Sequence, residues 1–365
     1  MSGSVSSLAP PGYGELGQVI ANSTNVHHAL DTLTEQASSG MVANTYAGLG
    51  NGAAISLNLT PQIDALKSWQ SNIGAANTYM GVTQNAMSQI EQVAANFYAK
   101  MPNLDGLNPS EVDSIAADAN LALTQVTSLM DTQENGVYVF AGQDTTNPPV
   151  PNPDSFLTSG FYTQISGAVS GLSANGAVAT TAATLAIATS NAPGTSPFST
   201  YLSQPAANLQ APVVQTGQGA TQSIGLLASA NSSVASVGTG TTSTGSYMRD
   251  LLMSLSTLGS LSSSQVNDPG FAGVVASTST TLNNAITAMN GDIGVYGDTQ
   301  ASLTTMQTNL GDTVTTLTTQ VSGAQDTDMA ATLSNLSQVQ TQLQASYQLI
   351  AGMSTLSLAK FLPAA

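Results

Sequence analysis

Long apolar stripes with helical spacing lie toward both ends of this chain, and they limit its fold more than any other feature. Apolar residues recur at steps of three, four or seven between Ile63 and Met101, and again between Leu282 and Val321. That spacing places them on one face of a helix. A helix of about 40 residues is ~60 Å long, so each stripe must be buried against another long helix. The two stripes can bury each other, which predicts an antiparallel bundle.

Proline and glycine indicate where these helices end. We expect the first long helix to begin at Thr60, with Pro61 in its first turn, and to end at Pro102. No proline occurs between residues 282 and 362, which predicts one very long C-terminal arm with a break near residues 322–323.

The middle of the chain has a different composition and hydrophobic pattern. The pattern VYVFAG, followed by a proline-rich turn, predicts a short strand near residues 137–142. Beyond it Gly, Ala, Ser and Thr dominate, and the segments FYTQI, TLAIAT and APVVQT favour strands. We therefore expect a small β-rich domain inserted between two helical arms.

These patterns predict a mainly α fold class: a long antiparallel helical or coiled-coil bundle formed by the N- and C-terminal arms, with an inserted β-rich domain. We expect three parts. They are a terminal helical domain, a helical bundle domain and a variable inserted domain, which cover residues 1–50 with 323–365, residues 51–150 with 246–322, and residues 151–245.

The composition excludes several classes of function. Charged residues make up only 7% of the chain, and four Lys and Arg residues against twenty Asp and Glu residues give a net charge of -16. So few cations argue against binding to nucleic acid or to anionic lipid.

No stretch is apolar for the ~20 residues that a bilayer requires, and the N-terminus lacks the charged and apolar regions of a cleaved signal peptide. A surface of hydroxyl and amide groups permits self-assembly, because charged residues are depleted at interface cores.

Groups suited to catalysis or metal binding are scarce. The chain has no cysteine, and its two histidines, His27 and His28, are adjacent and therefore about 100° apart on a helix. A zinc protease motif needs two histidines four residues apart with a glutamate between them. Asp326 and Asp328 lack the spacing of a calcium-binding loop, and they are expected to stabilise the N-terminus of the last helix. We expect no catalytic residue, no metal and no cofactor.

The outermost segments have apolar stripes with little sequence left to cover them. Near the start, an apolar stripe predicts a helix that ends at Gly40, which suits a C-cap. We expect residues 1–45 and 323–365 to become fully ordered only on joining neighbouring subunits. The expected interface residues are Leu30, Leu33, Leu333, Leu336, Leu343, Tyr347, Ile350 and Leu356.

Three segments resemble one known family. They are LDTLTEQASSGMVANTYAGLGNGAAISL from Leu30, NGVYVFAGQDTTNPPV from Asn135, and LSNLSQVQTQLQASYQLIAGMSTLSLAKFL from Leu333. They resemble the bacterial flagellin superfamily and, within it, the hook–filament junction proteins. One departure is the segment after Ser38-Ser39-Gly40, which lacks the basic residue and the Asp-Asp-Pro turn of relatives.

The resemblance implies a structural, non-enzymatic subunit of the extracellular flagellum. It implies terminal helices that assemble helically with other copies, with other hook-associated proteins and with flagellin. It also implies secretion by the flagellar export apparatus with an export chaperone, without a cleaved signal.

Two alternatives stay open. One is flagellin itself, the major filament subunit, because its helical arms are similar. The other is a secreted adhesin or surface-layer-like protein. A further hypothesis is that the low charge suits assembly in acidic surroundings, where self-repulsion would weaken.

Overall fold

The computed structural model describes residues 11–104 and 109–355. The chain divides into two compact units, one built from the described residues up to Leu66 and from Asp312 onward, the other from Lys67 to Gly311. Two long helices, α2 (Gly52–Lys100) and α7 (Phe271–Gln325), contribute to both units.

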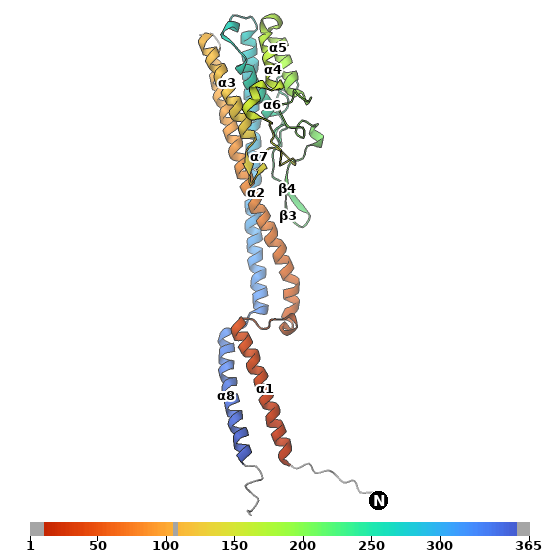
Figure 1. Cartoon of the computed structure of the whole chain (residues 1–365), viewed down its shortest axis with the longest axis vertical. Helices are drawn as coiled ribbons and strands as arrows, with labels where there is room; N and C mark the ends of the chain where they lie inside the picture. Colours follow the sequence, from red (N-terminus) through yellow and green to blue (C-terminus); the bar gives the residue numbers. More distant parts are fainter. Residues whose placement is uncertain (1–10, 105–108, 356–365) are drawn as a thin grey trace, which may run out of the picture. The chain divides into compact units, whose positions relative to one another are not determined.

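The first unit is helical. It contains α1 (Pro11–Ser39), the short 3₁₀ turn η1 (Tyr46–Leu49), the beginning of α2, the end of α7 and α8 (Met329–Thr355). Helices α1 and α8 pack side by side along their length (Figure 1). The predicted pairing of N- and C-terminal helices is therefore confirmed within this unit.

The second unit adds several shorter elements to the remainder of α2 and α7. In chain order they are η2 (Met101–Leu104), α3 (Pro109–Met130), β1 (Gln133–Glu134), β2 (Val137–Tyr138), η3 (Pro153–Thr158), α4 (Gly160–Ser170), α5 (Leu172–Thr189), η4 (Ala206–Asn208), β3 (Val213–Gly217), β4 (Ala220–Ser223), α6 (Tyr247–Gly259) and η5 (Ser263–Gln265). The strands form two separate antiparallel hairpins, β1–β2 and β3–β4. Figure 1 shows α4, α5 and α6 beside the bundle of α2, α3 and α7.

The core of the second unit follows the predicted stripes. Met80, Met87 and Ile90 on α2 are fully buried, as are Leu282 and Met289 on α7. Helix α6 is buried on every side from its first residue almost to its last, because α3, α4 and α5 pack against it.

Glutamine and glycine residues alternate across the contact between α2 and α7. Gln307 Nε2 donates to the carbonyl of Gln70 at 3.3 Å, and it lies so close to Gly74 that a Cβ there would be 3.0 Å away. One heptad along, Gln300 Nε2 donates to the carbonyl of Asn77 at 3.1 Å. These pairs let two weakly hydrophobic helices approach closely and fix their relative register. We call them the Gln–Gly ladder.

The predicted fold class is confirmed: the protein is mainly α, with a small β-containing region inserted between long helices. Two local expectations are wrong. The segments FYTQI and TLAIAT lie in helices α4 and α5. Phe161, Ile165 and Val169 recur every fourth residue and are all buried, so helical packing outweighs their strand propensity. The segment APVVQT does enter a strand, β3.

The expected start of the first long helix is also wrong. Helix α2 begins at Gly52, and Pro61 lies inside it. Two turns therefore precede the proline, with Ser56 buried on one side of it and Ile63 on the other. The C-terminal break lies at residues 326–328, close to the expected place. The division into three domains stays a prediction, although residues 151–245 all belong to the second compact unit.

Candidate assembly surface

The α1–α8 pair holds most of the expected interface residues. Leu30 and Leu33 on α1 are half-buried, and Leu336, Leu343 and Ile350 on α8 are half-buried as well. Leu356 lies outside the described residues. The apolar stripes of both helices are thus partly covered within the chain and partly open to solvent.

Two of the expected interface residues on α8 stand out by their exposure. Leu333 is 52% exposed and Tyr347 is 50% exposed. Leu349, at 63%, is more exposed than either. The helical spacing did not predict it, because it lies two residues from Tyr347 and off the stripe. Helix α8 carries no Asp, Glu, Lys or Arg from its first residue to its last. It therefore offers a neighbour an uncharged surface, whose burial costs no desolvation of charge.

His27 takes part in helix pairing. Its Nε2 lies 2.5 Å from the hydroxyl oxygen of Tyr347, and the two rings meet edge to face with centroids 5.9 Å apart. This contact joins α1 to α8, so it orients the ring of Tyr347, whose surface is still half exposed. Among the residues that the structure describes, no group of three or more His, Asp or Glu side chains could hold a metal ion.

Two connecting segments pair with each other at one end of α1 and α8. Gly40 ends α1 with a positive φ of 70°, so the expected C-cap is confirmed. Its carbonyl accepts from Thr327 N at 2.9 Å, and Val42 N donates to the carbonyl of Gln325 at 2.7 Å. This short backbone ladder fixes where α1 stops relative to α8.

Asp328 caps helix α8. Its Oδ1 accepts from the backbone N–H groups of Ala330 at 2.9 Å and Ala331 at 3.1 Å. Such a carboxylate satisfies N–H groups that a helix leaves unpaired at its first turn. The expected role of this aspartate at the N-terminus of the last helix is confirmed.

A shallow groove lies in the first unit where α2 begins and α7 ends. Its volume is about 740 Å³, and its walls are mostly small or apolar side chains, including Ile55, Leu59 and Ala324. Gly52 is required there, because a Cβ at this position would lie 2.8 Å from the carbonyl oxygen of Ala324. Ile55 and Leu57, on the same stretch of α2, are among the exposed apolar residues. The apolar spacing from Ile63 to Met101 did not predict either as a surface residue, because both lie outside that stripe.

Comparison with known families decides the relationship. Residues 18–145 match the bacterial flagellin N-terminal helical region, and residues 279–362 match the bacterial flagellin C-terminal helical region. Together these two matches span more than half of the chain. The chain belongs to the bacterial flagellin family. No curated protein sequence matches it.

The fold of this flagellin-family protein also resembles a solved structure. That structure is described as a flagellar hook-associated protein from Vibrio parahaemolyticus, with a TM-score of 0.50 and 12% sequence identity. The match covers 74% of this chain and 96% of that chain. At this identity the likeness concerns the fold.

Family membership fixes the broad role. The protein is a non-enzymatic structural component of the extracellular bacterial flagellum, it self-assembles, and it is exported by the flagellar system. None of the helices within the described residues is both long and apolar enough to cross a membrane.

Proposed function

We propose that this flagellin-family protein is the junction subunit that joins the flagellar hook to the filament. The observation that carries the proposal is the likeness of its fold to a flagellar hook-associated protein, over nearly all of that chain. The segment from Asn135 to Val150, with its β-hairpin and proline-rich turn, supports the same role by its resemblance to junction proteins.

The α1–α8 pair is the surface by which we expect the subunit to join its neighbours. Leu333, Tyr347 and Leu349 lie exposed on a helix without charges, and neighbouring copies would bury them. Each fully buried aromatic or aliphatic side chain contributes about 1.5–3 kcal/mol. Because charged groups are absent, this gain is not offset by desolvation of charge.

The partners follow from this role. One end of the junction would contact another hook-associated protein, and the other end would contact flagellin, with sibling copies at the sides. We expect export without a cleaved signal, by the flagellar export apparatus and with an export chaperone. The chaperone would cover the apolar side chains that the terminal helices expose before assembly.

Deletion of the gene tests the junction role. Without a junction, filaments cannot attach to hooks, so the cells should be non-motile and should release flagellin monomers into the medium. Electron microscopy and gel analysis of the medium measure both effects. The junction role is wrong if deletion instead removes the major protein band of isolated filaments, a result that assigns the protein to the filament as flagellin.

The second alternative, a secreted adhesin, gives another outcome. Cells without the gene would then swim normally and attach poorly to surfaces. Family membership already makes the protein a flagellar component, so an adhesin role would have to come from the inserted region.

A truncation tests the assembly surface. A chain that lacks residues 336–365 should remain a soluble monomer and should no longer sediment with isolated hooks or filaments. The second compact unit does not include these residues, so its thermal unfolding should be unchanged, which serves as the internal control. Sedimentation of the truncated chain with hooks at the level of the full chain contradicts the proposed surface.

A further inference from the structure

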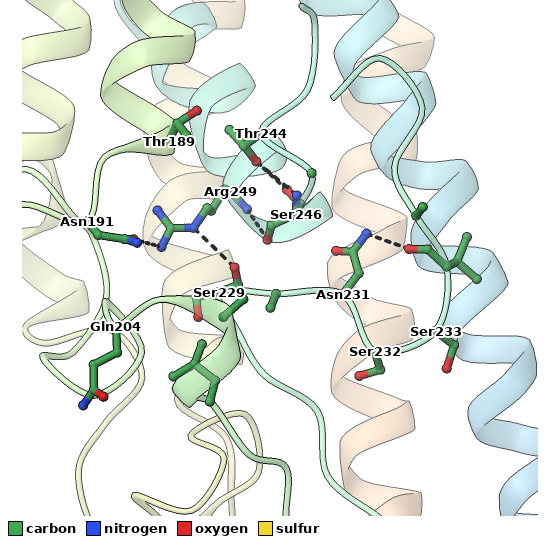
Figure 2. A pocket seen from close by; sticks show the side chains of 16 residues that line it. Thr189, Asn191, Gln204, Ser229, Asn231, Ser232, Ser233, Thr244, Ser246 and Arg249 are labelled. Atoms are coloured by element: carbon green, nitrogen blue, oxygen red, sulfur yellow. Dashed lines mark hydrogen bonds between the residues drawn. The ribbon is translucent and has the colours of Figure 1, made fainter. Parts of the chain in front are cut away.

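A polar pocket lies in the inserted region. The proposed assembly surface on α1 and α8 does not include it. Its volume is about 490 Å³, and it opens between the end of α5, the turn η4, residues 229–235 and the start of α6. In Figure 2, Arg249 and Asn191 lie on one side, and Asn231 and Ser233 lie on the other. The whole lining belongs to the second compact unit.

The lining favours one kind of ligand. Hydroxyl, amide and small side chains form nearly all of it, with one guanidinium, no carboxylate and no aromatic ring. Pockets for apolar ligands are lined mainly by hydrophobic and aromatic side chains, so an apolar ligand is a poor match. Hydroxyl and amide groups both donate and accept hydrogen bonds, which suits a small molecule rich in hydroxyl groups.

The guanidinium belongs to Arg249, the only arginine in the sequence, and its side chain is buried. Its Nε donates to the carbonyl of Ser229 at 3.3 Å, and its Nη1 donates to the carbonyls of Ala188 at 3.0 Å and Ser190 at 3.4 Å. Its Nη2 donates to Oδ1 of Asn191 at 2.7 Å. A guanidinium has five N–H groups, so one N–H on Nη2 has no partner among the described residues.

The charge of Arg249 is not paired. All four acceptors are neutral, and within the described parts of the chain the guanidinium forms no ion pair with a carboxylate. Desolvation lowers the pKa of Arg249 to about 10, and the charge of nearby Asp250 partly opposes this. The group is therefore a cation at neutral pH, and a buried cation without a paired anion is costly.

Other polar groups of the wall are open to a ligand. Ser232, Ser233 and Gln204 line the same pocket as the guanidinium and are exposed. A carboxylate would satisfy the guanidinium, and hydroxyl groups would bond with these side chains.

We propose that this pocket binds an acidic monosaccharide of the hexuronic acid class. The carboxylate of the sugar pairs with the guanidinium of Arg249, and the sugar hydroxyl groups bond with Ser232, Ser233 and Gln204. A charge-assisted hydrogen bond is roughly twice as strong as a neutral one. The site does not depend on which flagellar position the subunit occupies.

Calorimetric titration of the full chain with D-galacturonate tests the proposal. Galacturonate should bind at least about tenfold more tightly than galactose or acetate. Galactose offers only hydroxyl groups, and acetate offers only a carboxylate. Equal affinity for galactose overturns the role of the guanidinium. Absence of heat from galacturonate at concentrations of about 10 mM overturns the site itself.

Two pairs of variants locate the binding. Ala206 and Ala207 are both exposed in η4, and only Ala206 lines the pocket. Ala206→Trp should abolish binding, and Ala207→Trp should leave it unchanged. Ser233→Ala should weaken binding severalfold, whereas Ser256→Ala, which removes a hydroxyl outside this pocket, should not. Thermal unfolding shows separately whether Ala206→Trp is folded. Unchanged binding by this variant contradicts the proposal.

Discussion

Asp131 links stability to pH at the scale of a single residue. Its carboxylate accepts the backbone N–H of Val150 at 2.9 Å, at the point where the proline-rich turn returns to the end of α3. Burial raises the pKa of Asp131 to about 6, and the hydrogen bond from Val150 only partly opposes this. The carboxyl group therefore stays protonated in the folded chain at pH values where it ionises in the unfolded chain.

The sign of the pH effect follows from that shift. The stabilising contribution of Asp131 is complete below its unfolded pKa, near 4, and is lost as pH rises through about 6. We expect the free energy of unfolding to fall by about 1 kcal/mol across this window, after discounting for partial exposure. Urea unfolding between these pH values measures it.

Asp131→Asn should remove this part of the pH dependence, because an amide does not titrate. The exposed Asp154, in the neighbouring turn, gives the control Asp154→Asn, which should leave the pH profile of the wild type unchanged. A profile for Asp131→Asn that matches the wild type would show that another group is responsible.

Asp292 anchors a long connecting segment to α7. One carboxylate oxygen accepts from Ser233 N and Val234 N, both at 2.9 Å, and the other accepts from Ser232 N at 2.8 Å. Asp292→Asn replaces one acceptor with a donor that faces a backbone N–H, so it should cost about 1–3 kcal/mol of unfolding free energy. Chemical denaturation measures this loss. The control Asp298→Asn, also on α7, should change stability by less than about 0.5 kcal/mol.

At the scale of elements, helical spacing was a reliable guide where one face is buried. The stripes of α2 and α7 predicted their pairing, and Gly40 predicted the end of α1. Pro61 led to a wrong predicted start for α2, because a proline inside a helix is normally unfavourable. In the folded chain, tertiary packing stabilises α2 on both sides of this proline. The Gln–Gly ladder could not be predicted from one helix alone. Which glycine lies opposite which glutamine depends on the register of the two helices, which the sequence does not give.

The Gln–Gly ladder predicts how two Gly→Ala changes on the long helices differ in their effect on stability. Gly74→Ala and Gly294→Ala each add a methyl group to a long helix, which favours the helix by up to about 1 kcal/mol. A Cβ at position 294 meets nothing within 4 Å, whereas one at position 74 lies 3.0 Å from Gln307 Nε2. Thermal unfolding should show Gly294→Ala as the more stable variant, by about 1 kcal/mol. Equal stability of the two variants would mean that the ladder contributes nothing.

At the scale of the whole molecule, assembly combines a large net charge with an uncharged helix. A charge of -16 per subunit repels neighbouring copies, while α8 contributes no charge to that repulsion. Mild acid protonates part of the carboxylates and should strengthen assembly. Light scattering of concentrated protein at about pH 5 and pH 7 measures this, and equal assembly at both values contradicts an adaptation to acidic surroundings.

The central claim is that exposed apolar side chains on α8 hold the subunit in the flagellum. Its most direct test compares two double variants in co-sedimentation with isolated hooks and filaments. Leu333→Ser with Tyr347→Ser changes the proposed surface, and Leu121→Ser with Val178→Ser removes two exposed apolar residues from the second unit. We predict that the first variant stays in the supernatant as a folded monomer while the second sediments like the wild type. Sedimentation of both variants at the wild-type level would contradict the claim.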